Sequence, residues 1–475
     1  MTDTTPAAHP APGRWSLPQG VLKVIGTSGI STIGTLAMNV ALGLLVYDIT
    51  GRELDLGLIG LAEFLPTALL APIVGPIADR YDRRKVVSVA LLLEAVAALG
   101  LALYTRTGPT RVWPIFALIV GFGIARAAVA PALRALPADL SGDQLARVVP
   151  LSSAAWQLAV IVGPVVGGFL YVVGPQWPFY LAVVLATVGA GLILWAPDPR
   201  KLEEHHTRVT ARPPGTTQDA GRGALREAVE GLAFVRRTPI LLGAISLDLF
   251  AVLFGGAVAL LPAVADQRLG VGAVGLGWLR AAGGMGAGAT TLLLAWRPVQ
   301  RRVGRVLLIA VAVFGVGTLA LAFTRTYAVA FLAMAVLSGA DAISVFIRAT
   351  LVPLVTPPQM RGRVLATENV FIGASNELGA FESGVAGQLF GVVGAIASGG
   401  VATLLIVFIW WWRFPALRDV DRFSDVIAGR PDPHAPRDPP DPHDPHDPPD
   451  PPDPPDGVAR PEHRNVGEIV GSADG

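Results

Sequence analysis

The stretch Gly75-Pro76-Ile77-Ala78-Asp79-Arg80-Tyr81-Asp82-Arg83-Arg84-Lys85 is a short charged segment between two long apolar runs. The runs are Leu56–Ala78 and Val86–Tyr104. At about 1.5 Å per residue in a helix, each is long enough to cross a hydrocarbon layer of roughly 30 Å. Because loops rich in arginine and lysine stay on the cytoplasmic side of a membrane, we expect this segment to be a cytoplasmic turn between two spans.

The composition is that of a polytopic membrane protein. Of 475 residues, 52% are hydrophobic and 15% are charged, and the mean hydropathy is +0.54. This is too apolar for a soluble chain. The chain contains no cysteine, which excludes disulfides, thiol catalysis and cysteine metal sites. The basic residues gather in the predicted loops, so they indicate topology and not a nucleic-acid partner.

Hydropathy predicts an all-α membrane protein with twelve transmembrane helices, and the longest connection divides them into two six-helix bundles. The predicted spans are Val21–Tyr47, Leu56–Ala78, Val86–Tyr104, Val112–Leu136, Val148–Val173, Trp177–Trp195, Ile240–Ala265, Val274–Trp296, Val306–Phe323, Ala328–Val352, Val364–Leu389 and Val393–Trp412. The last two are separated only near Gly391–Gly394. The basic residues alternate between loops, so both termini are predicted to be cytoplasmic and the chain to be a multi-pass protein of the plasma membrane.

Five segments follow from these spans. They are residues 1–20, a cytoplasmic N-terminal segment; 21–196, the first bundle; 197–239, a cytoplasmic central loop; 240–413, the second bundle; and 414–475, a tail. The first segment has no pattern of a removable signal peptide. Within the central loop, Ala224–Arg237 alternates apolar and charged residues as an amphipathic surface helix does. The tail is rich in proline and aspartate and is expected to be disordered.

The charged segment resembles the signature loop of the major facilitator superfamily, which reads G-x-x-x-D-R/K-x-G-x-R/K-R/K. Asp82 stands where the general pattern has glycine. The resemblance implies that Asp79 clasps the start of the eleventh helix, near Gly362–Val364, when the inner side is closed. The residues of this candidate gating loop are Gly75, Asp79, Arg80, Arg83, Arg84 and Lys85.

Other motifs resemble the drug:proton antiporter branch that contains the enterobactin and macrolide exporters. In the fifth span, Gly163, Pro164, Gly167 and Gly168 are similar to its G-P-x-x-G-G element. The second half matches over Leu247-Asp248-Leu249-Phe250, Gly339-Ala340-Asp341, Arg361-Gly362-Arg363-Val364 and Gly373–Gly379. The resemblance covers most of residues 20–418. It implies proton-driven efflux of an amphipathic small molecule, such as a siderophore, a macrolide or a drug-like compound, by alternating access.

Charged residues within apolar spans cost at least ~2.5 kcal/mol each at the membrane centre, so each needs a partner or a wet cavity. They are Glu63, Glu94, Arg126, Asp248, Arg280, Asp341, Arg348, Glu368, Glu377 and Glu382. Counting along the spans places Glu63, Arg280 and Glu382 toward the outside. All seven histidines lie outside the spans, so carboxylates would have to carry a coupled proton. The candidate coupling residues are Arg126, Asp248, Asp341, Arg348 and Glu377; alternatively, these residues form static ion pairs.

Polar amides within the spans offer either cargo contacts or interhelical hydrogen bonds: Asn39, Gln157, Asn369 and Asn376. Alternative functions are an importer of a small polar solute, a non-transporting sensor and a membrane-embedded transferase. The central loop offers a transferase only His205-His206 beside Glu203-Glu204, so we expect no enzyme, cofactor or metal site. The expected partners are a small-molecule substrate, protons and the lipid bilayer, and we expect a monomer.

Overall fold

A computed structural model describes residues 19–141, 144–197 and 220–426. The side chains of 71–73, 75–80 and 220–228, with some between 130 and 146, lie outside the described part. The chain separates into Met1–Gly429 and Arg430–Gly475, and only the first unit contains described residues. The fold below is therefore that of the first unit.

The described residues form helices. In the first half these are α1 (Gln19–Thr50), α2 (Glu53–Arg80), α3 (Arg83–Arg106), α4 (Trp113–Ser141), α5 (Leu145–Val173) and α6 (Trp177–Leu194). After α8 (Ala220–Arg237), the second half contains α9 (Pro239–Phe254), η2 (Ala257–Leu260), α10 (Leu261–Val264), η3 (Ala265–Leu269), α11 (Ala273–Trp296), α12 (Val303–Phe323), α13 (Tyr327–Val355) and α14 (Arg361–Arg413). Two short elements, α15 (Pro415–Arg418) and η4 (Phe423–Val426), follow.

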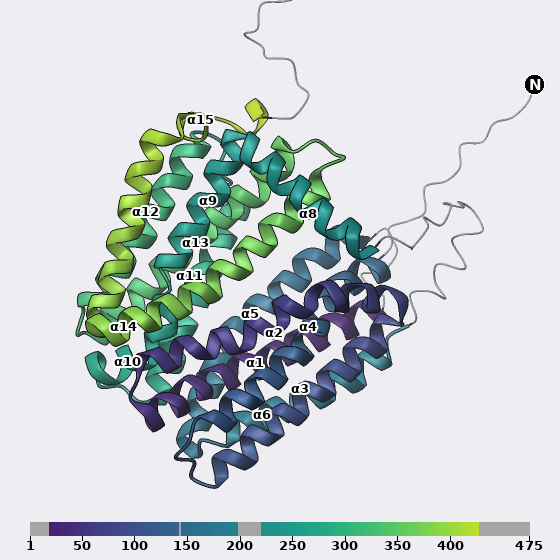
Figure 1. Cartoon of the computed structure of the whole chain (residues 1–475), viewed down its shortest axis with the longest axis vertical. Helices are drawn as coiled ribbons and strands as arrows, with labels where there is room; N and C mark the ends of the chain where they lie inside the picture. The colour runs from purple at the N-terminus through teal and green to yellow at the C-terminus, as the bar shows by residue number, and fades with distance from the viewer. Residues whose placement is uncertain (1–18, 142–143, 198–219, 427–475) are drawn as a thin grey trace, which may run out of the picture. The chain divides into compact units, whose positions relative to one another are not determined.

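Eight helical segments in the described ranges are long and apolar enough to cross a membrane, judged by length and composition. They comprise α1, α3, α5, α6, the run Pro239–Leu269, α12, α13 and α14. The helices α2, α4 and α11 pack among them. In Figure 1, α1–α6 lie together in purple and blue, and α9–α14 lie beside them in teal and green. The fold is thus the predicted all-α arrangement of two groups of membrane helices.

Two predicted spans at the end of the second half form one element that bends sharply. Gly391 interrupts α14 with φ of 71°, a left-handed conformation that glycine adopts without a steric penalty. The chain therefore turns at Gly391, inside the interval Gly391–Gly394 where the sequence separates the last two spans. Residues Arg361–Phe390 and Val392–Arg413 are the two helical arms.

The first span of the second half is not continuous, in contrast to the prediction of one helix over Ile240–Ala265. The helix α9 ends at Phe254, and Gly255 and Gly256 separate it from the 3₁₀ turn η2 and the short α10. A Cβ at Gly256 would lie 2.5 Å from the Gly379 carbonyl oxygen of α14. The break therefore lets α14 approach the backbone of this span closely.

Two helix pairs make the most extensive contacts between the halves: α2 with α14, and α5 with α11. Both contacts use glycine. A Cβ at Gly57 of α2 would lie 2.8 Å from the Ala380 carbonyl oxygen of α14, and a Cβ at Gly168 of α5 would lie 2.5 Å from the Ala273 carbonyl oxygen at the start of α11. Since Gly57 is near the start of α2 and Gly168 near the end of α5, both contacts lie toward the end of the molecule where α1 joins α2.

The structured body extends past the predicted start of the tail. Leu417 of α15 is fully buried, and the backbone N–H of Val303 donates to the Asp421 carbonyl oxygen. A Cβ at Gly304 would collide with the Leu417 carbonyl oxygen. The segment 414–426 therefore packs on the start of α12. The rest of the predicted tail, from 427, and residues 1–18 lie outside the described residues.

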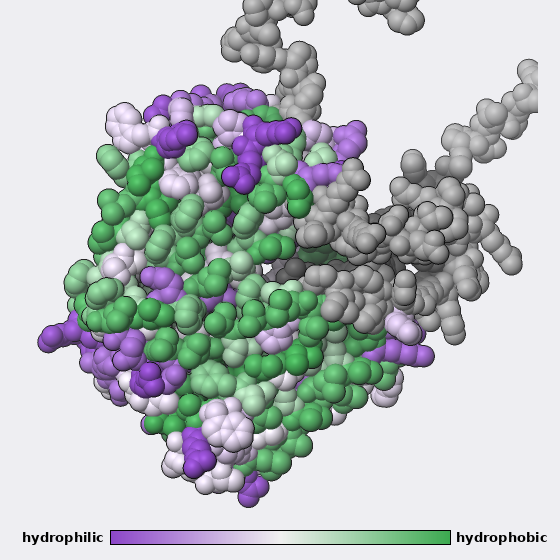
Figure 2. Space-filling view, in the orientation of Figure 1, coloured by the Kyte–Doolittle hydropathy of each residue, from purple (hydrophilic) through white to green (hydrophobic). Residues whose placement is uncertain are grey.

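The surface distributes hydrophilic and hydrophobic residues as a protein within a bilayer requires. Figure 2 shows hydrophilic residues near the helix ends and hydrophobic residues along the helix sides. Large exposed apolar side chains on those sides include Val96 of α3, Val172 of α5, Leu292 of α11 and Leu332 of α13. In water such a surface would be unfavourable, whereas lipid tails solvate it at no cost.

The glycine contact between α2 and α14 should be intolerant of larger side chains. We expect Gly57→Val to lower the melting temperature of the purified protein, because overpacking a close contact costs about 1–3 kcal/mol. The control is Gly121→Val in α4, where a Cβ would meet nothing within 4 Å. Equal melting temperatures for the two variants would contradict the packing described here.

Candidate functional site: a charged cavity between the halves

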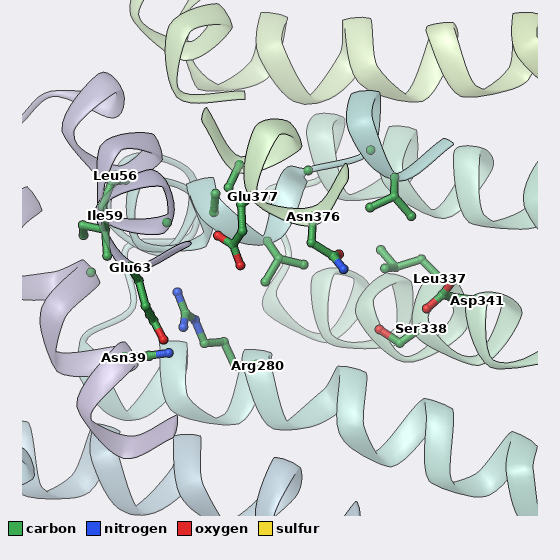
Figure 3. A pocket seen from close by; sticks show the side chains of 18 of the residues that line it. Asn39, Leu56, Ile59, Glu63, Arg280, Leu337, Ser338, Asp341, Asn376 and Glu377 are labelled. Atoms are coloured by element: carbon green, nitrogen blue, oxygen red, sulfur yellow. The ribbon is translucent and has the colours of Figure 1, made fainter. Parts of the chain in front are cut away.

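A cavity of about 380 Å³ lies between the two halves. Its walls come from α1, α2, α9, η2, α11, α12, α13 and α14, so both halves line it. The apolar part includes Ile59, Val252, Phe314 and Leu337. The polar part is formed by Asn39, Glu63, Arg280, Ser338, Asp341, Asn376 and Glu377 (Figure 3).

One end of the cavity gathers groups from three helices. In Figure 3, the side chains of Glu63 (α2), Glu377 (α14) and Arg280 (α11) project into the same part of the cavity. Gly60 makes room for this arrangement, because a Cβ there would lie 2.5 Å from Glu377 Oε2. Arg280 has no carboxylate oxygen within 4.0 Å among the described residues, and its Nε is buried without a hydrogen-bond partner. Asn39 Oδ1 is likewise buried without a donor.

The first half contains a cluster of one arginine and two carboxylates that is only partly buried: the side chains of Arg126 and Glu63 are 39% and 21% exposed, whereas that of Glu94 is 3% exposed. Arg126 Nε of α4 lies 3.4 Å from Glu63 Oε1, and Arg126 Nη1 lies 4.0 Å from Glu94 Oε1 of α3. Near this cluster, Thr67 joins α2 to α4, because its hydroxyl donates a hydrogen bond to the Gly123 carbonyl oxygen. Glu377 of the second half lies within electrostatic range of Glu63 and Arg126. This cluster therefore includes a group from each half.

The second half also contains a cluster of one arginine and two carboxylates. Arg348 Nη2 of α13 lies 2.8 Å from Asp248 Oδ1 of α9, and Arg348 Nη1 donates to Glu368 Oε1 of α14 over 3.3 Å. The three side chains are only 4–9% exposed. Although α4 and α13 are each the fourth membrane helix of their half, the two arginines lie at different levels: Arg126 is 13 residues from the start of α4 at Trp113, and Arg348 is 21 residues from the start of α13 at Tyr327.

Asp341 links the second cluster to the cavity. It lines the cavity wall and has no hydrogen bond or salt bridge to another described residue. It lies within electrostatic range of Asp248 and Arg348. A cavity-facing carboxylate is thus coupled by charge to a buried ion pair.

The structure brings the candidate coupling residues into two groups. Asp248, Asp341 and Arg348 are together in the second half, whereas Arg126 and Glu377 meet at the boundary between the halves. The sequence did not select Glu63, Glu94, Arg280 and Glu368 as coupling residues, although all were recognised as charges within spans. Glu63 and Arg280 both line the cavity, which a count of depth along each helix could not show, and their predicted position toward the outer side stays a prediction.

The residues of the G-P-x-x-G-G element pack on two neighbours. A Cβ at Gly163 would lie 2.8 Å from Leu36 Cβ of α1, and a Cβ at Gly167 would lie 2.6 Å from the Ala37 carbonyl oxygen. Gly168 meets the start of α11, and a Cβ at Gly277 of α11 would lie 2.5 Å from the Pro164 carbonyl oxygen. This element therefore holds α5 between the first bundle and the second.

Only part of the candidate gating loop can be described. The side chains of Gly75, Asp79 and Arg80 lie outside the described part, so the proposed clasp of Asp79 on Gly362–Val364 stays a prediction. Asp82 caps α3: its carboxylate accepts hydrogen bonds from the Arg84 backbone N–H and from Arg84 Nε and Nη2. Arg84 Nη1 in turn donates to the Ala196 carbonyl oxygen after α6. Arg83 is partly buried and Lys85 is exposed.

The four amides have different surroundings. Gln157 Nε2 donates to the Gly284 carbonyl oxygen and joins α5 to α11. Asn369 and Asn376 each donate to a carbonyl oxygen of their own helix, at Leu365 and Ile372. Asn39 and Asn376 line the cavity, so these two are positioned to contact a cargo.

A family model described as Major Facilitator Superfamily matches residues 24–305, which is more than half of the chain. The chain belongs to the Major Facilitator Superfamily. Its members are transporters of small molecules through membranes, not enzymes, and the all-helical architecture with a cavity between two halves is that of this superfamily.

Among curated superfamily members, macrolide efflux protein A of Streptococcus pyogenes is 26% identical over 209 residues. The match covers 44% of this chain and 49% of that protein, so the chain spans about half the length of this relative. Quinolone resistance protein NorA of Staphylococcus aureus is 29% identical over 149 residues, which are 31% of this chain and 37% of that protein.

Solved structures of superfamily members share the fold. A variant of the nucleoside transporter NupG superposes with a TM-score of 0.66 at 11% identity, covering 83% of this chain and 100% of that one. A D-xylose-proton symporter superposes with a TM-score of 0.60 at 16% identity, covering 84% and 98%.

The stability of the protein should depend on the positive charge of Arg348 in its buried cluster. We expect Arg348→Gln to destabilise the protein by about 3–5 kcal/mol at alkaline pH, because Asp248 and Glu368 would be left buried without a counter-ion. Asp248→Asn should cost less, since Arg348 keeps Glu368. Thermal unfolding in detergent measures both.

The matched control for that prediction is Arg363→Gln. Arg363 pairs with Glu230 at 2.7 Å, but these side chains are 35% and 36% exposed, so the pair is worth about 0–1 kcal/mol. A loss of stability in Arg348→Gln no greater than in Arg363→Gln would contradict the importance of burial.

The cap of α3 predicts a pH-dependent contribution to stability. Partial burial acts to raise the pKa of the Asp82 carboxyl, but the hydrogen bonds and charge of Arg84 outweigh it and hold the pKa below its ordinary value. A lowered pKa stabilises the fold above the unfolded value of about 3.9, and this contribution is lost as pH falls through the folded value. We expect the difference in melting temperature between the wild type and Asp82→Asn to be full near neutral pH and to vanish in acid. A difference that grows in acid would contradict this.

Proposed function

We propose that the chain is a proton-coupled exporter of amphipathic small molecules that works by alternating access of its central cavity. The observation that carries the proposal is the cavity between the halves. Its wall presents two carboxylates, Asp341 and Glu377, that have no salt bridge to another described residue. Unpaired carboxylates within a membrane are costly when charged, and a proton or a cationic cargo relieves that cost.

The charge balance of the two clusters supports proton coupling. Each arginine, Arg126 and Arg348, faces two carboxylates, so each cluster carries a net negative charge when all groups are ionised. A proton on one carboxylate would make the cluster neutral while the arginine keeps its other partner. The clusters can therefore exchange protons without leaving either arginine unpaired, which matters most for Arg348 because it is buried.

The cavity also suits an amphipathic cargo. About 380 Å³ is the size of a pocket for a small organic molecule, and apolar side chains alternate with amide, hydroxyl and carboxylate groups on its wall. The relatives named for macrolide and quinolone resistance support a drug-like or macrolide cargo, as does the resemblance of the second-half motifs to exporters.

The membrane orientation and the gate belong to the same proposal. The basic loops support cytoplasmic termini and a position in the plasma membrane, in which case the described contacts between the halves lie on the outer side. Asp79 would then clasp the positive end of α14 when the inner side closes. Both halves would rock about the central cavity.

Transport by inverted vesicles tests the proposal. With an acidic interior, vesicles that contain the protein should accumulate a radiolabelled macrolide, and Glu377→Gln or Asp341→Asn should reduce this uptake to the level of empty vesicles. Exchange of labelled for unlabelled macrolide without a pH gradient should persist in the variants, because the cavity remains.

The control variant is Glu382→Gln. Glu382 lies on the same helix as Glu377, does not line the cavity and has no salt bridge to a described residue, so its substitution should leave proton-driven uptake intact. Wild-type rates in both the Glu377→Gln and Asp341→Asn variants would remove these carboxylates from the coupling mechanism. Accumulation by whole cells in place of extrusion would favour an importer.

A further inference from the structure

The helix α13 presents a line of polar groups that begins at the cavity and ends in the buried second-half cluster. Asp341, Ser344 and Arg348 are spaced three and four residues apart, so they share one face of the helix. Asp341 lines the cavity, whereas Ser344 is 2% exposed and Arg348 is 3% exposed. The line of polar groups therefore leads from the cavity wall into the protein interior.

Two polar atoms along this line are buried without partners: Ser344 Oγ and Arg348 Nε. Other hydroxyls in α13 and α12 donate to a carbonyl oxygen four residues earlier, as Thr350 does to Phe346 and Thr318 to Phe314. Ser344 does not. A buried polar group in a native protein is satisfied by protein or by an ordered water, so this pair requires an explanation.

A water molecule between the two atoms explains both. It would accept a hydrogen bond from Arg348 Nε, exchange one with the Ser344 hydroxyl, and donate to the carboxylates of Asp341 and Asp248. Buried waters generally make two to four hydrogen bonds of this kind, roughly three on average. The cavity that Asp341 lines supplies the route by which such a water enters.

The depths of the carboxylates form an ordered series. Depth is the distance along each helix from its end at Val355 of α13 or Arg361 of α14, at about 1.5 Å per residue. On this scale, Arg348 of α13 and Glu368 of α14 both lie roughly 10 Å deep. Asp341 lies roughly 20 Å deep on the same scale, and Asp248, counted from Pro239 of α9, lies between them at roughly 14 Å. A proton taken up at Asp341 therefore meets Asp248 next.

We propose that Ser344 is a positioning residue for a water that carries a proton between Asp341 and Asp248. In the transfer, the Asp341 carboxylic acid gives its proton to the water while the water gives one of its own to the Asp248 carboxylate. The water is regenerated, Asp341 is left ionised at the cavity wall, and Asp248 becomes neutral. Arg348 keeps Glu368, so no buried cation is left unpaired. This inference rests on the proposed proton coupling and specifies its path in the second half.

Three variants test Ser344. Ser344→Ala removes the hydroxyl, Ser344→Thr retains it, and Ser375→Ala is the control, because Ser375 is equally buried at 1% exposed but donates to the Ile372 carbonyl oxygen of its own helix. We expect Ser344→Ala to slow proton-driven macrolide uptake by roughly tenfold or more, as loss of a proton-transfer group does. Gradient-free macrolide exchange should stay at the wild-type rate, and Ser344→Thr and Ser375→Ala should behave as wild type in both assays.

An infrared measurement tests the proposed proton transfer through the water without relying on a transport assay. In difference spectra of purified protein between acid and alkaline pH, the carboxylic-acid band that Asp341→Asn abolishes should shift in Ser344→Ala and not in Ser375→Ala. An unshifted band in Ser344→Ala, or equal loss of driven uptake and free exchange in that variant, would overturn the relay. Wild-type vesicles that show no proton-driven uptake while the band shifts as expected would overturn the proposed function and leave the water site standing.

Discussion

The arrangement of this protein depends on how charge is tolerated in an apolar interior. Arg126 and Arg348 are each placed on the fourth membrane helix of their half, and each is surrounded by two carboxylates from other helices. At the buried Arg348, a single pair would be a static link, because neutralising its one carboxylate would leave the guanidinium alone at a cost of several kcal/mol. With a second carboxylate in place, one acid can change its charge while the arginine stays paired.

The helix packing allows these charged side chains to come together. Glycine at Gly57, Gly60 and Gly168 brings backbones from opposite halves into contact, and the absent side chain at Gly60 is the space that Glu377 occupies. In the second half, the break at Gly255–Gly256 exposes backbone at the cavity wall while Gly379 of α14 packs against it. Irregular backbone at membrane depth is acceptable where it is buried by protein or faces a wet cavity, and this break meets both conditions.

Much of the fold followed from the sequence, and the reason is physical. Long apolar runs must be helical in a bilayer, since every backbone group needs an internal partner, and Gly391 was recognisable as the point where two such runs meet. The break after Phe254 was not, because Gly255 and Gly256 are apolar enough to continue a hydropathy pattern. The packed segment 414–426 was also missed, since only Leu417 and Val420 in it are buried.

The site was predicted less completely than the fold. The sequence identified Asp341 and Glu377 as charges within spans that need a cavity or a partner, and both line the cavity. Which way a side chain points depends on how helices pack against each other. The positions of Glu63 and Arg280 at the cavity, and the pairing of Arg348 with both Asp248 and Glu368, therefore emerged only from the structure.

The space at Gly60 has one more consequence. It allows Glu377, which is covalently part of the second half, to sit in the electric field of the first. In the proposed mechanism, a rotation that separates α2 from α14 would carry this carboxylate away from Glu63 and Arg126 with no change in its own helix. A rigid-body motion would then alter the electrostatic surroundings of a titratable group, which is a direct way to couple such a motion to a proton.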